Sequence, residues 1–156
     1  MTGLVSIALG IAQTQIGVRE HGRNRGPEID GYCRDIGHDP EKADPWCAIF
    51  VSAMFKRAAD QLGVPMPFHA TAGVFTLDER APRWAITRTP APGAIFIKVG
   101  HRHTGIVESV GTHGVLTIEG NTSPAGSSDG DGVYRRTRRF DEIMSYINLS
   151  LPQDQA

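Results

Sequence analysis

Excess charge, cysteine and long apolar runs are all scarce in this sequence. Its 156 residues include 16 Lys and Arg against 17 Asp and Glu, which gives a formal net charge of -1. Such a balance argues against a nucleic-acid partner and against stable association with an anionic membrane. The two cysteines, Cys33 and Cys47, are too few for a disulfide framework in a chain of this size, so we expect both to be thiols.

A recognisable export signal is also missing. The apolar stretch from Leu4 to Ala12 has no Lys or Arg before it and no small-x-small cleavage site after it. Leu4, Ile7, Ala8 and Ile11 recur at helical spacing, which predicts a core-facing amphipathic helix instead of a signal peptide. No run is long enough to cross a bilayer. We therefore expect synthesis in the cytoplasm, so that any action outside the cell needs another exit route.

Helical and strand-like patterns are segregated along the chain. The patterns are helical before about Gly63 and strand-like after about Pro92, which is typical of an α+β domain with an antiparallel sheet. We expect residues 1–156 to form a single domain, a monomer, with N-terminal helices packed on a C-terminal sheet. The strand candidates are Ala94 to Val99, His103 to Val110, Val115 to Asn121, Val133 to Phe140 and Ser145 to Leu151.

Two more helices are predicted after the first. The second opens at Pro27 and ends at Gly37. The third has clear punctuation, with Asp44 as N-cap, Pro45 at the first helical position and Gly63 at its end. Its apolar residues form one stripe that should be buried, consisting of Ala48, Val51, Phe55, Ala58 and Leu62.

Three other segments have weaker patterns. Residues 64–92 are Pro-rich, which predicts an irregular connection over the sheet, anchored by Phe75 and Trp84. Residues 120–132 hold many Ser, Gly and Asp residues and indicate a mobile loop. The basic run at residues 135–139 lies in a strand-like stretch, and we interpret it as a solvated strand, with weak attraction to an acidic polymer as the alternative.

Cys47 falls in the first turn of the third predicted helix. Unpaired backbone N–H groups and the positive end of the helix dipole favour an anion there, so a thiol ionises more readily and becomes a nucleophile. The same N–H groups can bind the oxyanion of a tetrahedral intermediate. Cys33 lies mid-helix, and we interpret it as a small buried hydrophobe. That interpretation stays open for Cys47 as well.

The segment from His103 to Asn121 predicts a β-hairpin, because two alternating runs flank the Gly-bounded turn at residues 111–114. Folding about this turn brings His103 opposite the end of the second strand. Side chains alternate along a strand, so Glu119 and Asn121 share one face, and either could orient the imidazole. A nucleophile, a base and an acceptor follow the logic of serine and cysteine triads. Glu108, in mid-strand, should face solvent.

Two other interpretations remain. His101 and His103 form a His-x-His pair, a spacing that zinc sites also use, so a zinc-dependent hydrolase is an alternative. Against it, the sequence contains no His-Glu-x-x-His motif and no convincing third ligand, and we expect neither metal nor cofactor. A module that binds without catalysing is the second alternative. The remaining histidines should be exposed in loops or turns, and they are His21, His38, His69 and His113.

Three motifs in a fixed order carry a resemblance. The run DPWCAIFV (44–51), followed by GHRHTGIVESV (100–110) and TIEGNTS (117–123), resembles the cysteine, histidine-dependent amidohydrolase/peptidase (CHAP) family. Upstream, GVRE (17–20) and NRGPEID (24–30) look like the region that precedes the cysteine in phage-type members. The resemblance implies a papain-like fold and a hydrolase that cleaves amide bonds of bacterial peptidoglycan. Members act as N-acetylmuramoyl-L-alanine amidases or as stem-peptide endopeptidases.

The resemblance also implies roles for individual residues. By position, Cys47 matches the nucleophile, His103 the base, Glu119 the third polar residue and Asn121 a supporting polar group. Trp46 matches the aromatic residue before the nucleophile, which implies that it lines the substrate groove. Two further residues are groove candidates on weaker grounds, Glu20 and Asn24.

The chain departs from the family pattern at two places. Ala94 stands after the Pro-Gly that opens the first long strand, where relatives often carry an acidic residue. Some relatives have an Asp-rich calcium loop before the nucleophile; residues 37–44 contain acids without that spacing, so we expect no structural calcium.

The expected partners are peptidoglycan stem peptides. Because no separate wall-binding domain is evident, the sequence is compatible with a phage endolysin and with a bacterial toxin or remodelling enzyme. The protein would then act on the cell wall after release by lysis or through a secretion system. A secreted effector would have an immunity protein as a further partner, and the non-catalytic alternative becomes a module that only binds muropeptides.

Overall fold

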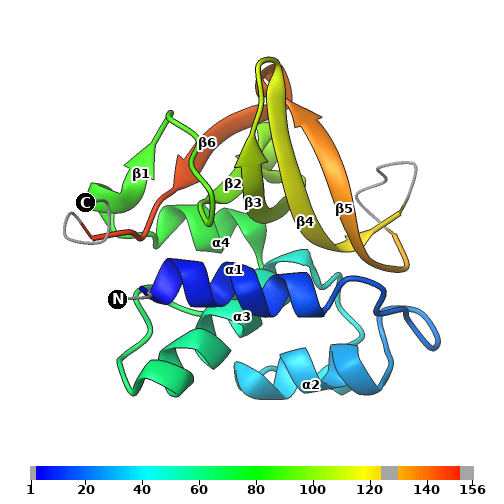
Figure 1. The fold of residues 1–156 in the computed structure, drawn as a ribbon. Helices are drawn as coiled ribbons and strands as arrows, with labels where there is room; N and C mark the ends of the chain where they lie inside the picture. Colours follow the sequence, from blue (N-terminus) through cyan, green and yellow to red (C-terminus); the bar gives the residue numbers. More distant parts are fainter. Residues whose placement is uncertain (1–2, 124–129, 152–156) are drawn as a thin grey trace.

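The computed structural model describes residues 3–123 and 130–151, and it confirms the α+β fold class. Figure 1 shows the helices gathered in one layer, with the strands in a second layer above them. The helices are α1 (Leu4–Thr14), α2 (Pro27–Asp35), α3 (Cys47–Leu62) and α4 (Val74–Glu79), with the short 3-10 turns η1 (Pro40–Lys42), η2 (Arg83–Ala85), η3 (Val99–His101) and η4 (Phe140–Glu142). Within the described residues, none of the helices has the length and apolar character to cross a membrane.

In the described parts of the chain, the sheet has six antiparallel strands in the order β1-β6-β2-β3-β4-β5. The strands are β1 (Ile86–Thr87), β2 (Ile95–Lys98), β3 (Thr104–Val110), β4 (Gly114–Thr122), β5 (Gly132–Arg139) and β6 (Ile143–Ile147). The five strands expected from the sequence are all present, with shifted ends. Strand β1 was not expected, because its two residues show no alternation and pair only with β6 at the sheet edge.

Helix α3 lies at the centre of the molecule and packs against α1, α2 and strands β3 and β4. Every residue from Cys47 to Phe55 is buried. A helix that is apolar all round has to be buried all round. The sequence-based stripe was therefore too narrow, and it was also wrong at its end, because Leu62 is 41% exposed.

The start of α3 differs from the prediction. The helix begins at Cys47 with Trp46 as N-cap, so Asp44 is not the cap. The Asp44 carboxylate instead lies 2.9 Å from Nε2 of His38, which holds it on the preceding loop. The other end is as predicted, since Gly63 closes the helix in the left-handed conformation, with φ 68°.

The segment between α3 and β2 is more regular than predicted. It contains α4, whose Leu77 is buried, and an upstream anchor in Phe68. Phe75 and Trp84 are each 60% exposed, so the prediction that they anchor the segment was wrong. Phe75 and Leu77 stand two residues apart on a helix, which places them on opposite sides of it.

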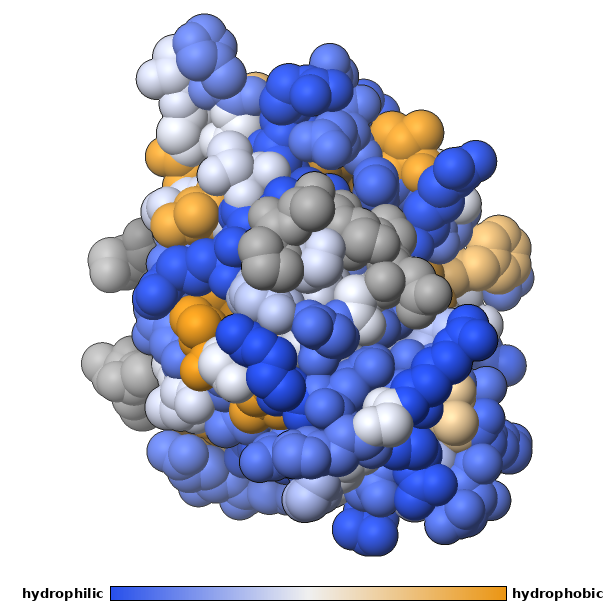
Figure 2. Space-filling model, turned by 90° about the vertical axis from the view of Figure 1, so that its right-hand side faces the viewer, coloured by the Kyte–Doolittle hydropathy of each residue, from blue (hydrophilic) through white to orange (hydrophobic). Residues whose placement is uncertain are grey.

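The surface beside β5 is largely hydrophilic in Figure 2, with hydrophobic side chains in small separate groups. Strand β4 extends to Thr122 and β5 begins at Gly132, so both ends of the predicted loop 120–132 are strand. Its middle, residues 124–129, lies outside the described residues. Glu108 does not face solvent freely, because its side chain is only 14% exposed and its carboxylate pairs with Arg135.

Candidate active site

Cys47 is the first residue of α3 and is 6% exposed. Trp46 provides no side-chain cap, and within the described chain the backbone N–H groups of residues 47–49 donate to no backbone carbonyl. Such unpaired N–H groups, together with the helix dipole, favour negative charge next to the sulfur. The thiol therefore lies where both a thiolate and an oxyanion can be stabilised.

His103 is delivered to this point by the loop before β3. Its ring is completely buried, and its carbonyl oxygen accepts a 3.0 Å hydrogen bond from the N–H of Lys98, which closes the loop. The register of β3 and β4 pairs Ile106 with Ile118. Carried along the strands, this register sets His103 across from Asn121, as the hairpin pattern predicts.

Glu119 reaches His103 through a gap left by a glycine. His103 Nε2 lies 2.9 Å from Glu119 Oε1, and neither side chain has any exposed area. A Cβ on Gly105 would come within 2.7 Å of Glu119 Cγ and 2.8 Å of the Phe96 ring. A glycine at this position therefore lets the carboxylate pass beside β3. In the resting structure the two atoms are close but not aligned as a regular hydrogen bond.

The charge on His103 is set by its two neighbours. Burial by itself lowers the pKa of His103, but the Cys47 side chain and the Glu119 carboxylate outweigh burial and raise the pKa to about 9. The imidazole is therefore protonated at neutral pH. An imidazolium between a sulfur and a carboxylate is the arrangement that stabilises a thiolate.

Glu119 is held on its other side by Arg138. The Arg138 guanidinium donates from Nε to Oε2 at 2.8 Å and from Nη2 to Oε1 at 2.5 Å, and Thr117 Oγ1 donates to Oε2 at 2.6 Å. Burial raises the pKa of Glu119, but Arg138 and His103 together lower it to about 2. Arg138 is 3% exposed, so the interpretation of the basic run as a solvated strand was wrong for this residue.

Asn121, the other residue considered for orienting His103, occupies a different environment. It is completely buried and adopts φ 54°, a left-handed conformation that is uncommon outside glycine. Among the described residues, its side-chain amide has no hydrogen-bond partner. Of the two candidates, Glu119 is the one whose carboxylate lies against the ring.

A cleft of about 520 Å³ opens over Cys47. Its walls come from the loop before α2, the start of α4 and the turn η3, which contribute Arg23, Gly73, His101 and Arg102. The thiol lines the cleft, whereas His103 and Glu119 lie beneath the surface. The site thus combines an accessible sulfur with a base that is shielded from water.

A family model described as the CHAP domain matches residues 39–121, more than half of the 156 residues. The chain belongs to the CHAP family. CHAP domains are typically hydrolases of amidase or peptidase type that act on peptidoglycan. Searches of curated proteins and of solved structures gave no match.

The CHAP match contains Cys47, His103 and Glu119, and it ends before Arg138. Arg138 was missed by the sequence analysis because a five-residue basic run looks like a solvated surface. A signal for it existed in the strand pairing, since residues that pair across β4 and β5 share one face of the sheet. Glu119 pairs with Tyr134, which places Arg136 and Arg138 on its face.

Two of the three predicted groove residues, Trp46 and Asn24, are buried supports. Trp46 has no exposed surface, so it cannot line a groove, and its Nε1 donates to Glu20 Oε1 at 2.7 Å. Asn24 is 4% exposed and donates from Nδ2 to the carbonyl of Ala43 at 2.9 Å. These contacts fix the loops around Cys47. The prediction that Trp46 lines the groove was therefore wrong, whereas the groove role of Glu20 stays a prediction.

The two residues of the His-x-His pair turn to different partners. His101 Nε2 lies 2.7 Å from Asp78 Oδ2, and its ring packs edge-on against Phe75, whereas His103 faces Glu119. In the parts of the chain that the structure describes, no group of three or more His, Cys, Asp or Glu residues is arranged to hold a metal ion. Of the histidines expected to be exposed, His38 is not, since it is half-buried against Asp44.

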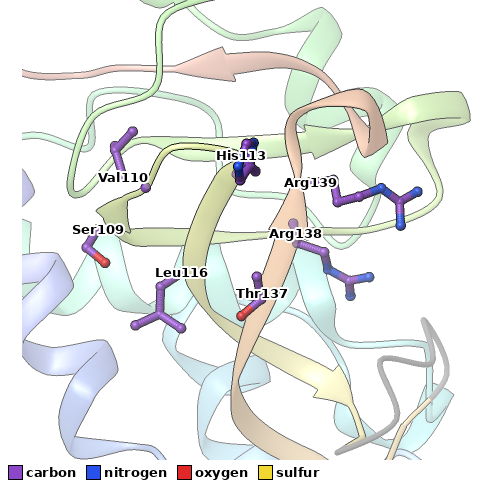
Figure 3. A pocket seen from close by; sticks show the side chains of 9 residues that line it. Ser109, Val110, His113, Leu116, Thr137, Arg138 and Arg139 are labelled. Carbon is purple, nitrogen blue, oxygen red and sulfur yellow. The ribbon is translucent and has the colours of Figure 1, made fainter.

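A second hollow, of about 310 Å³, lies at the turn of the β3–β4 hairpin. Figure 3 shows Ser109 and Val110 on one side of it and Thr137 and Arg139 of β5 on the other. Cys47 does not line it. The cleft over Cys47 is therefore the better candidate for the substrate of this CHAP domain.

Proposed function

We propose that this CHAP domain hydrolyses an amide bond in the stem peptide of peptidoglycan, with Cys47 as nucleophile, His103 as base and acid, and Glu119 as the residue that orients His103. The observation that carries the proposal is the order of the three groups. The His103 ring lies between the Cys47 thiol and the Glu119 carboxylate, and only the thiol reaches the cleft.

In the first half of the reaction, the Cys47 thiolate attacks the amide carbonyl carbon. A C–S bond forms, and the carbonyl electrons move onto oxygen, where the unpaired N–H groups at the start of α3 hold the negative charge. Because Nε2 of His103 faces Glu119, Nδ1 is left to face the sulfur and the leaving group. The imidazolium gives its proton to the leaving nitrogen, the C–N bond breaks, and a thioester remains.

In the second half, neutral His103 takes a proton from water. The hydroxide adds to the thioester carbonyl, the C–S bond breaks, and the thiolate and imidazolium are restored. Glu119 is ionised throughout, since its pKa of about 2 lies far below neutral pH. It therefore stabilises His103 each time the ring becomes positive, without exchanging a proton itself.

The cleft lining includes two arginines, and the Asp44 carboxylate that also lines it lies against His38. Arg102 is exposed on the cleft wall and, within the described chain, has no ion-pair partner; Arg23 lies in the same lining. Stem peptides carry free carboxylates near their amide bonds, and an arginine binds a carboxylate through paired N–H donors. These arginines support a stem-peptide substrate for the site. We further propose that the protein reaches the cell wall by lysis or through a secretion system.

Two treatments of the enzyme, each followed by an assay on purified peptidoglycan, test the proposal. Iodoacetamide should abolish release of new amino groups, because it alkylates Cys47, while a chelator should leave release unchanged. Mass spectrometry of the products then identifies the bond. Free glycan strands with intact peptides indicate an amidase, and shortened peptides still attached to glycan indicate an endopeptidase. Loss of activity with the chelator alone, or cleavage confined to glycosidic bonds, would overturn the proposal.

A further inference from the structure

Arg138 stands out among the charged residues outside the triad. We propose that Arg138 is a positioning residue for catalysis, which holds Glu119 ionised and aimed at His103. The inference rests on the proposed function, because it assumes that His103 and Glu119 serve Cys47. It extends that function to a residue of β5, beyond the residues that the family model matches.

The geometry shows that Arg138, more than His103, sets the position of the carboxylate. The guanidinium contacts both oxygens of Glu119 in a paired arrangement, at 2.8 and 2.5 Å, and Thr117 adds a third donor. Oε1 is shared between Arg138 and His103, and the contact to the imidazole is the less well aligned of the two. With both oxygens fixed from behind, Glu119 can present Oε1 to the ring in one orientation only.

The electrostatics require a cation at this point. A carboxylate with no exposed area pays a large desolvation cost and would otherwise take up a proton. The groups that face it are His103 from the loop before β3 and Arg138 from β5. Cys47 of α3 lies beyond His103, and Glu142 of η4 lies 3.8 Å from Arg138 Nη1. Thiolate, imidazolium, carboxylate and guanidinium form a row of alternating charges. Removal of the guanidinium therefore destabilises the ionised form of the carboxylate, and through it those of the imidazole and the thiol.

A purely structural brace between β4 and β5 accounts less well for this contact. The strands are already joined by backbone pairing from Gly114 to Glu119. Glu119 pairs with Tyr134, so Arg138 has to reach back along the sheet over Thr117 to meet it, and its guanidinium becomes buried on the way. A brace alone would be served by a contact at the surface, such as the one that Arg135 makes with Glu108.

The test measures the rate at which iodoacetamide alkylates Cys47 between pH 4 and 9 in the full chain. In Arg138→Met, Glu119 should take up a proton at a pH well above its present pKa of about 2. His103 then loses its counter-charge, and the fraction of Cys47 present as thiolate falls. We expect the acid limb of the profile to move up by at least one pH unit, a loss of rate of roughly tenfold on that limb. Arg138→Lys keeps the positive charge without the paired donors, so its acid limb should lie closer to that of the wild type than the limb of Arg138→Met does.

Arg135→Met is the matched control, since Arg135 lies on the same strand and pairs with a glutamate at the surface. Its profile should superimpose on that of the wild type. If Arg138→Met lowers the melting temperature and leaves the alkylation profile unchanged, the positioning role is wrong. Should Arg138→Met fail to fold, an unchanged alkylation profile in a folded Arg138→Gln variant, which removes the charge but keeps a polar side chain, overturns the positioning role equally. Alkylation needs no substrate, so failure of wild-type protein to cut peptidoglycan would overturn the proposed function separately.

Discussion

Glu119 carries a negative charge at a place that water does not reach. It can do so because Arg138, Thr117 and His103 surround the carboxylate with donors and positive charge. Its pKa is lowered from 4.5 to about 2, so it contributes stability that is fully present above pH 4.5 and is lost as the pH falls toward 2. For His103, whose pKa rises from 6.5 to about 9, the contribution is present below pH 6.5 and is lost as the pH rises through 9.

These shifts predict how stability depends on pH. The free energy of unfolding of the wild type should fall between pH 4.5 and 2 by on the order of 3 kcal/mol relative to Glu119→Gln, which has no charge to lose. Urea unfolding at a series of pH values measures this difference. Glu108→Gln is the control, because Glu108 also pairs with an arginine but at the surface, and its effect should be smaller. Parallel pH curves for wild type and Glu119→Gln would show that folding does not lower the pKa of Glu119.

At the scale of elements, local signals predicted most of what forms. The α1 helix, the close of α3 at Gly63 and the β3–β4 hairpin follow from spacing, glycine and alternation, which act within a few residues. The hairpin register alone was enough to bring His103 to the level of Asn121. What failed depends on distant packing: Asp44 faces His38 in place of the helix, and the burial of Trp46 is decided by α2 and α3 around it.

The residues at the rim of the cleft likewise depend on packing between distant segments, which local sequence patterns do not predict. Turn η3 and the start of α4 come together only in the folded chain, so no sequence pattern marked Arg102 as a cleft residue. Arg102→Gln should raise KM roughly tenfold for muropeptides with free carboxylates, with little change in kcat, because one charge-assisted bond to the substrate is lost. The kinetics are compared with those for substrates whose carboxylates are amidated, for which little change is expected.

The control for Arg102 is Arg83→Gln, an exposed arginine of η2 that does not line the cleft. It should leave KM unchanged for both kinds of substrate. An equal rise in KM for the carboxylate and amidated substrates, or a rise of the same size in Arg83→Gln, would mean that Arg102 does not recognise a carboxylate.

At the scale of the whole molecule, the fold brings the helical part and the sheet part of the candidate site into contact. Cys47 begins helix α3, while the imidazole and the carboxylate come from the sheet side, so the proposed chemistry takes place where the helices meet the sheet. Membership of the CHAP family agrees with this layout and gives the class of reaction. The bond that is cut, the partners and the route to the wall remain predictions.

The most direct test compares Cys47→Ala with Cys33→Ala on purified peptidoglycan. Both thiols are buried to a similar degree, but only Cys47 lines the cleft. New amino groups released from the wall are counted, and circular dichroism checks that each variant is folded. We predict that Cys47→Ala releases none while Cys33→Ala keeps most of the wild-type activity. Full activity in a folded Cys47→Ala protein would contradict the account.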